Sequence, residues 1–168
     1  MIRSRPKMDL IRVVDFKPQL MSSLAVTHAL LTSADFILHP AVSRVVLHGS
    51  RGPAGGYRPD SDIDLSLIVK TSPGVMQSEL QVLLHDVLEV TLNGWKGSVE
   101  ADLAAVFDAR DCGLRCFEQT AWHEELCSLG GVDCFGLYKV QRGFNGFIAN
   151  AGVQVKQMYP CLVIWQRI

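Results

Sequence analysis

Two aspartates separated by one residue follow a glycine and a serine at a spacing suited to phosphate chemistry. In a strand, residues two apart project from the same face, so Asp62 and Asp64 would lie side by side while their apolar neighbours enter the core. Two adjacent carboxylates repel each other unless a cation lies between them. Hard oxygen ligands of this kind suit Mg²⁺ or Mn²⁺. The segment is Val45-Val46-Leu47-His48-Gly49-Ser50, eleven residues, and then Asp62-Ile63-Asp64-Leu65.

The Gly49-Ser50 pair is suited to binding phosphate. A glycine at the end of a strand lets the backbone approach a ligand closely, because it has no Cβ. Ser50 adds a hydroxyl and its own N–H, and successive N–H groups in such a turn form an anion-binding concavity. Arg51 and Arg58 lie in the same loop, and either could neutralise phosphate charge. A lone Gly-Ser is usually only a turn, and a lone Asp-x-Asp is usually a solvated strand face. The combination within one strand–loop–strand unit is much less common.

This segment resembles the DNA polymerase beta-like nucleotidyltransferase superfamily, and especially its small stand-alone "minimal" domains. The resemblance is specific over 42–69 and architectural over 18–107. It implies transfer of a nucleoside monophosphate from an NTP to an acceptor hydroxyl, with release of pyrophosphate. It also implies nucleotide binding by Gly49, Ser50, Arg51 and Ser61, and a metal held by Asp62 and Asp64. The residues that carry it are His48-Gly49-Ser50-Arg51-Gly52 and Ser61-Asp62-Ile63-Asp64-Leu65-Ser66.

The resemblance further implies a third carboxylate on a later, neighbouring strand. Asp102, flanked by Ala101 and Leu103, is the expected third metal ligand and catalytic residue, and it would help to activate the acceptor hydroxyl. Glu100 shares its face and is the alternative, whereas Asp108 stands at the strand end. Glu100 and Asp102 could also simply form a solvated outer face of the strand.

A second function is compatible with the same resemblance. Minimal nucleotidyltransferase domains often occur in pairs with a small helical protein, so the chain could be a catalytically silent, antitoxin-like binding protein. Retention of both Asp62 and Asp64 favours activity. The sequence leaves the acceptor open between RNA, protein and a small molecule, and it leaves the base of the NTP and a homodimer open as well.

The order of the helices and strands expected around these residues indicates an α+β fold, with helices flanking a mixed sheet. We expect one domain over 1–168, in which 1–16 form a loosely attached arm, 18–107 the core, and 108–168 a C-terminal extension. A helix should start at Pro18 and stop before Pro40. Further helices are expected over 75–91 and 118–129. Strands are expected over 42–48, 62–69 and 98–107, and over 132–168 with a break at Arg142-Gly143.

Length and composition indicate the number of domains, the class of partner and the expected compartment of the protein. The 168 residues suit one domain, and a net charge of −1 with a pI near 6.5 argues against a strongly basic nucleic-acid surface. The apolar stretch 25–38 is interrupted by polar residues, so no membrane span is expected. No signal sequence is evident and the five cysteines are odd in number, which predicts a reducing cytoplasm. The spacings of Cys112, Cys116, His123, Cys127 and Cys134 match no common zinc knuckle.

Overall fold

The computed structural model describes residues 9–71, 74–127, 134–140, 146–148 and 155–167. Its centre is a six-stranded mixed sheet made of β3 (Val42–His48), β4 (Ile63–Val69), β5 (Ala101–Asp108), β6 (Phe135–Lys139), β7 (Gly146–Ile148) and β8 (Leu162–Gln166). The strand order is β7-β6-β5-β4-β3-β8. Strands β4 and β5 are parallel, and every other neighbouring pair is antiparallel. The chain is therefore α+β with a mixed sheet, as the sequence predicted.

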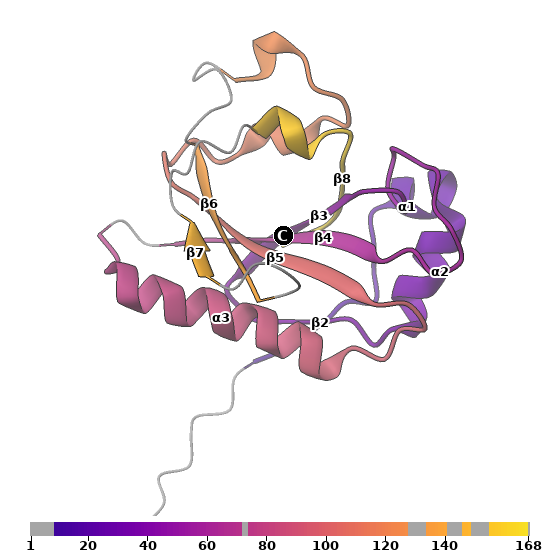
Figure 1. Ribbon diagram of the computed structural model, residues 1–168, viewed down its shortest axis with the longest axis horizontal. Helices are drawn as coiled ribbons and strands as arrows, with labels where there is room; N and C mark the ends of the chain where they lie inside the picture. Colours follow the sequence, from indigo (N-terminus) through magenta and orange to yellow (C-terminus); the bar gives the residue numbers. More distant parts are fainter. Residues whose placement is uncertain (1–8, 72–73, 128–133, 141–145, 149–154, 168) are drawn as a thin grey trace, which may run out of the picture.

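Helices and short 3₁₀ turns cover the two faces of this sheet. Helix α3 (Gln77–Gly94) lies along one face, and the 3₁₀ turns η1 (Arg115–Glu118) and η3 (Val155–Met158) lie over the other (Figure 1). The remaining elements are α1 (Pro18–Ser23), α2 (Ala25–Ser33), the 3₁₀ turn η2 (Glu124–Leu126), and a small antiparallel pair formed by β1 (Ile11–Arg12) and β2 (Ile37–Leu38). Among the described residues, no helix has the length and apolar character needed to cross a membrane.

Alternation along the strands decides which side chains face which layer. On β4, Ile63, Leu65 and Leu67 are buried in the core that α3 covers. Ile68 belongs instead to the second core, beneath the 3₁₀ turns. Asp64 lies between Ile63 and Leu65 and therefore projects from the 3₁₀ side of the sheet.

The predicted central strands and the long helix are confirmed, with small shifts at their ends. Strand β3 has the bounds expected from sequence, and β4 starts one residue later than expected. Helix α3 starts at Gln77 and continues through Gly94, beyond the predicted end at Thr91. Strand β5 starts at Ala101 and ends at Asp108. Boundaries shift by this much because helix and strand ends are weakly specified by local pattern.

The prediction of one continuous helix before Pro40 is wrong. The chain breaks at Leu24, whose φ of −138° and ψ of 56° are not helical, and α2 ends at Ser33. The Thr32 hydroxyl donates a hydrogen bond of 2.8 Å to the His28 carbonyl. Side chains of this type compete with helical backbone bonding. Asp35 then adopts a φ of +57°, which turns the chain into β2.

The N-terminal segment is attached to the domain where the structure describes it, in place of the loose arm that we expected over 1–16. The N–H of Val13 donates to the carbonyl of Phe36 at 2.9 Å, and the Val13 side chain is only 6 % exposed. The ring of Phe16 stacks on that of Phe36. Apolar residues in this segment therefore pack on the core. Residues 1–8 lie outside the described residues.

The expected helix over 118–129 is also wrong in its described part. Residues 115–118 and 124–126 form 3₁₀ turns with an extended residue between them, since Gln119 has a φ of −98° and a ψ of 144°. The carbonyl of Thr120 accepts a hydrogen bond of 3.0 Å from the N–H of Cys161. Because this bond pairs the chain with a distant segment, it replaces a local helical bond. Residues 128–133 and the predicted break at Arg142-Gly143 lie outside the described residues.

Packing of α3 on the sheet yields a stability prediction. Leu84 is fully buried, whereas Val82 on the same helix is 62 % exposed. Leu84→Ala should lower the free energy of unfolding by roughly 2–5 kcal/mol, because it removes buried apolar surface and leaves a cavity. Val82→Ala should change it by less than about 0.5 kcal/mol. Urea denaturation of both variants measures the difference, and similar losses would contradict the packing described for α3.

Candidate active site

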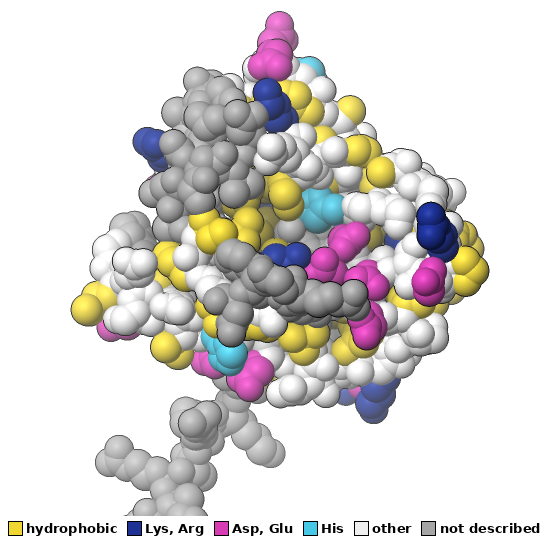
Figure 2. All heavy atoms as spheres, viewed as in Figure 1, with side chains coloured by type: hydrophobic (Ala, Val, Ile, Leu, Met, Phe, Trp, Pro, Cys, Tyr) yellow, Lys and Arg dark blue, Asp and Glu magenta, His cyan; other side chains and the backbone are white. Residues whose placement is uncertain are grey.

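The site lies where four neighbouring strands place polar side chains in a row. His48 pairs with Asp64 across β3 and β4, and Asp64 pairs with Asp102 across β4 and β5. Lys139 on the next strand completes the row, and all four line one cavity of about 290 Å³. Acidic, basic and histidine side chains gather around a hollow on this face (Figure 2). The volume is near the lower end of ligand pockets, which hold roughly 300–1,000 Å³.

Gly49 closes one end of the row, and only a glycine fits there. Its φ is +71°, a left-handed conformation that favours glycine. A Cβ at this position would collide with the carboxylate of Asp64. The backbone after β3 therefore passes directly against the Asp64 carboxylate, whereas the approach expected from sequence was to a phosphate ligand.

The loop after Gly49 is held from inside by Arg51. Its guanidinium donates to the carbonyl of Ser61 at 2.7 Å and to those of Arg58 and Pro59 at 3.1 Å. The side chain is 3 % exposed and lies over the ring of Tyr57. Arg51 thus fixes the shape of the loop, and its donors are directed to the loop itself in place of the phosphate contact that we expected.

Ser61 also has a structural partner within this loop. Its hydroxyl accepts a hydrogen bond of 2.8 Å from the N–H of Arg58. Ser50 follows Gly49 in the chain and is partly exposed, but it is not among the residues that line the cavity. Of the four expected nucleotide-binding residues, Gly49 therefore lies against a carboxylate, and Ser50 is its neighbour in the chain. Arg51 and Ser61 shape the loop that carries them.

The surroundings of Asp64 disfavour the charged form of its carboxyl group. Its pKa is raised from 3.8 to about 6. Desolvation by burial is the largest cause, followed by a hydrogen bond to Asp102 and by the negative charges of Asp102 and Asp62, whereas Lys139 acts in the opposite direction. Both neighbouring aspartates thus act on Asp64: Asp62, as the two-residue spacing predicted, and Asp102, the carboxylate that the resemblance implied. A proton or a cation near Asp64 would relieve the repulsion.

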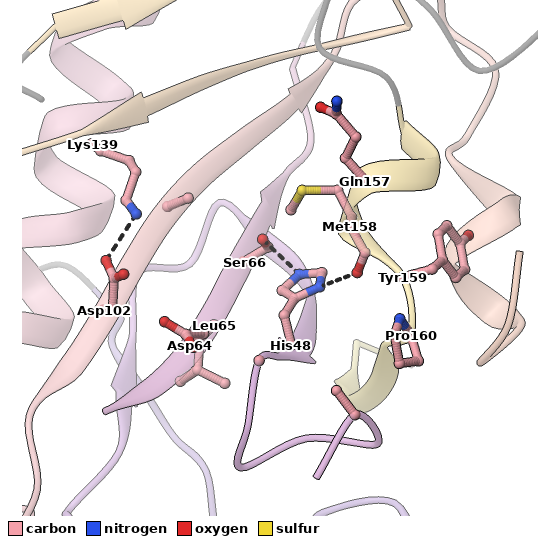
Figure 3. A pocket seen from close by; sticks show the side chains of 13 residues that line it. His48, Asp64, Leu65, Ser66, Asp102, Lys139, Gln157, Met158, Tyr159 and Pro160 are labelled. Atoms are coloured by element: carbon pink, nitrogen blue, oxygen red, sulfur yellow. Dashed lines mark hydrogen bonds and ion pairs between the residues drawn. The ribbon is translucent and has the colours of Figure 1, made fainter. Parts of the chain in front are cut away.

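Lys139 supplies one positive charge to this group. Its Nζ lies 2.9 Å from Oδ1 of Asp102, with the two side chains about one-third exposed at 31 % and 28 % (Figure 3). That Asp102 oxygen is itself excluded from solvent. The ammonium therefore neutralises Asp102 on the side away from Asp64.

His48 connects the strands to the opposite wall of the cavity. Its Nδ1 lies 2.8 Å from the carbonyl of Met158, and its Nε2 lies 2.8 Å from the hydroxyl of Ser66 (Figure 3). A carbonyl can only accept, so Nδ1 carries the proton and Nε2 accepts from Ser66. Burial lowers the pKa of His48, which favours this neutral form. His48 thus links β3 to Ser66 on β4 and to the backbone at Met158.

The register distinguishes the candidates for the third carboxylate. Asp102 is directly opposite Asp64, whereas Glu100 precedes β5 and is exposed. Asp108 is at the other end of β5, about 20 Å away at the usual rise per residue. Its carboxylate accepts hydrogen bonds from the N–H groups of Arg110 and Cys112 at 3.2 Å. Asp108 therefore organises a turn, and Asp102 is the neighbour of Asp64.

The chemistry of these residues fits a hard divalent cation. Asp64 and Asp102 present carboxylate oxygens from paired positions, and the negative charges of Asp102 and Asp62 add to the effect of burial in raising the pKa of Asp64. Lys139 supplies part of that charge in the arrangement described. Within the part of the chain that the structure describes, no group of three or more His, Cys, Asp or Glu side chains is arranged to hold a metal ion.

Two features of the site were not found from sequence. Lys139 was missed, although Phe135, Leu137 and Lys139 alternate on one face and place a charge at the end of an apolar strand. The wall formed by Gln157 to Pro160 was missed as well, because η3 carries no recognisable motif. These residues come from the part of the sequence with the weakest periodicity.

Comparisons with known proteins add no relatives: the chain matches no family model, no curated protein and no solved structure.

The raised pKa of Asp64 predicts a pH-dependent gain in stability on Asp64→Asn. The folded-state pKa of about 6 lies above 3.8, so stability from protonated Asp64 is complete below pH 3.8 and is lost as the pH rises through 6. Without metal at pH 8, the free energy of unfolding of Asp64→Asn should therefore exceed that of the wild type by about 1–2 kcal/mol, a figure already reduced for solvent screening. Near pH 4 the two proteins should be alike.

Urea denaturation from pH 4 to pH 8 in the presence of a chelator measures this difference. Asp60→Asn is the matched control, since Asp60 is exposed in the neighbouring loop, and its effect should not vary with pH. A constant difference between wild type and Asp64→Asn over this range would contradict the electrostatic account of the site.

A pair of glycine variants tests the close contact between Gly49 and Asp64. Gly49 and Gly55 share a φ of +71°, but a Cβ on Gly55 would meet nothing within 4 Å. Both alanine variants incur a backbone cost of roughly 1–2 kcal/mol. Gly49→Ala should lose roughly a further 1–3 kcal/mol, because its methyl group displaces the Asp64 carboxylate. Equal losses by urea denaturation would show that the contact is unimportant.

Proposed function

We propose that the protein is a metal-dependent nucleotidyltransferase with a polymerase beta-like fold. The proposal has the protein move a nucleoside monophosphate from an NTP to an acceptor hydroxyl and release pyrophosphate. The observation that carries it is the pairing of Asp64 with Asp102 on parallel strands, next to the Gly49 turn. The sequence motif supplied Gly49 and Asp64, and the sheet register brings Asp102 to them independently of the motif.

Each part of the site has a role in the proposed reaction. The acceptor oxygen attacks the α-phosphorus of the NTP, the bond from that phosphorus to the bridging oxygen of the β-phosphate breaks, and pyrophosphate leaves. Asp102 takes the proton of the acceptor hydroxyl as general base. Gly49 and Ser50 bind the phosphate chain through backbone N–H groups and the serine hydroxyl.

Asp62, Asp64 and Asp102 would hold Mg²⁺ or Mn²⁺. In such a site the ion supplies charge stabilisation to the attacking and leaving oxygens. The protein's own part is to bring the carboxylates together although burial, and after it the charges of Asp102 and Asp62, raise the pKa of Asp64. Arg51 contributes indirectly, because its bonds to loop carbonyls fix the segment between the serine and the aspartates.

The acceptor is RNA, protein or a small molecule, and a cytoplasmic setting goes with the proposal. The cavity is near the lower size limit for ligand pockets, so it suits the phosphate chain better than two complete substrates. We expect the acceptor to approach from the open side of the hollow (Figure 2). A homodimer is compatible with this arrangement.

The ion pair between Lys139 and Asp102 favours a second candidate function. A third carboxylate that is already neutralised suits a silent protein that kept the fold for binding, such as an antitoxin-like partner of a small helical protein. Such a protein would co-purify with its helical partner and transfer no label from an NTP.

Ligand-induced thermal shifts test the binding half of the proposal. Millimolar ATP, GTP, CTP or UTP with Mg²⁺ should raise the melting temperature for at least one nucleotide, since a ligand at ten times its Kd stabilises by about 1.4 kcal/mol. The shift should disappear in Asp62→Asn, Asp64→Asn and Asp102→Asn, and it should survive in Asp60→Asn. For each variant, the melting temperature with nucleotide is compared with that of the same variant without nucleotide, because Asp64→Asn also changes the stability of the ligand-free protein.

Label transfer tests the chemical half. NTPs labelled at the α-phosphate are incubated with the protein, Mg²⁺ and a cell lysate, and the RNA, protein and small-molecule fractions are then separated. Label should enter one fraction with the wild type and with Asp60→Asn, but not with Asp64→Asn. Absence of a thermal shift with every NTP would refute the proposal, whereas binding without transfer would favour the second candidate.

A further inference from the structure

Lys139 has a defined position at the candidate site that neither the motif nor the proposed reaction explains. Strand β6 places it beside β5, where its Nζ lies 2.9 Å from Asp102 Oδ1. Among the described residues that line the cavity, it is the one with a permanent positive charge. The neighbouring Arg51 directs its donors to loop carbonyls instead. The negative charge of the aspartates is therefore balanced mainly by this ammonium.

We propose that Lys139 is a positioning residue: its ammonium is an internal counter-ion of Asp102, which a divalent cation must displace in order to bind. The inference rests on the proposed function, because it concerns the same carboxylates. The ammonium and a metal ion would compete for the Asp102 carboxylate, whose oxygen Oδ1, the one nearest Lys139, is buried. Like-charge repulsion prevents both cations from sharing it closely.

The position of Lys139 on β6 allows a metal ion to displace its ammonium from Asp102. Its backbone is fixed in the sheet, where Lys139 pairs with Gly146 on β7. Its side chain is a flexible four-carbon stem and is 31 % exposed. The ammonium can therefore leave Asp102 without disturbing the strand, and it remains in the cavity where an anionic ligand would lie. Lys139 thus holds Asp102 in place until a metal replaces it.

Mn²⁺ binding without nucleotide tests this exchange. Free Mn²⁺ is measured by electron paramagnetic resonance at pH 8 for the full chain, for Lys139→Met and for Lys139→Arg. Lys139→Met should bind Mn²⁺ about tenfold more tightly than the wild type, because one competing charge is gone. Lys139→Arg keeps the charge and should stay close to the wild type. Lys70→Met is the matched control, since Lys70 is exposed beyond the other end of β4, and it should have no effect.

Thermal stability provides a second readout that does not depend on activity. Without metal, Lys139→Met should melt at a lower temperature than the wild type, because Asp102 and Asp64 then repel without a counter-ion. Saturating Mn²⁺ should remove most of that deficit. Lys139→Gln, which keeps a polar group of similar reach, is measured in parallel in case the methionine variant folds poorly.

The outcomes separate this inference from the proposed function. Mn²⁺ binding in the wild type that is lost in Asp64→Asn, but is unchanged or weaker in Lys139→Met and Lys139→Gln, would overturn the inference and leave the proposed function standing. Tighter binding in these two variants, with Lys139→Arg and Lys70→Met near the wild type, would support it. If neither the wild type nor any variant binds Mn²⁺, both the inference and the proposed function fail.

Discussion

The structure depends on holding negatively charged carboxylates together on the two central strands of a hydrophobic sheet. Asp64 and Asp102 are paired on parallel strands, and burial together with the neighbouring carboxylates raises the pKa of Asp64. Proteins rarely keep half-buried like charges adjacent without a counter-charge. The ammonium of Lys139 supplies part of it. The repulsion that remains is the property that makes the site a candidate for a divalent cation.

The fold brings these groups together through two local devices. Alternation in β4 and β5 buries Leu65 and Leu103 against the helical layer and turns the aspartates toward the cavity. The left-handed turn at Gly49 brings the backbone against Asp64, where any side chain would collide. The apolar strands that carry the carboxylates also desolvate them. The packing that stabilises the sheet therefore disfavours the charged form of the carboxylates.

Sequence reasoning predicted this half of the site because its signals are local. Strand alternation predicted which face of its strand carries Asp64, and the resemblance implied a third carboxylate at Asp102, which the sheet register places opposite Asp64. Lys139 and the wall at Met158 escaped prediction, since they reach the site only through strand pairing over long distances in the chain. Arg51 shows the related difficulty that a charge in a phosphate-binding loop can equally hold the loop from inside.

Paramagnetic broadening by Mn²⁺ tests the central claim most directly, because it locates the cation on the protein. Amide signals of the ¹⁵N-labelled wild type are followed while Mn²⁺ is added at low stoichiometry. The account predicts that signals near Gly49, Asp64 and Asp102 broaden first, and that Asp64→Asn removes the effect. Broadening centred on the turn at Asp108, or no localised broadening at all, would contradict a metal site at the paired carboxylates.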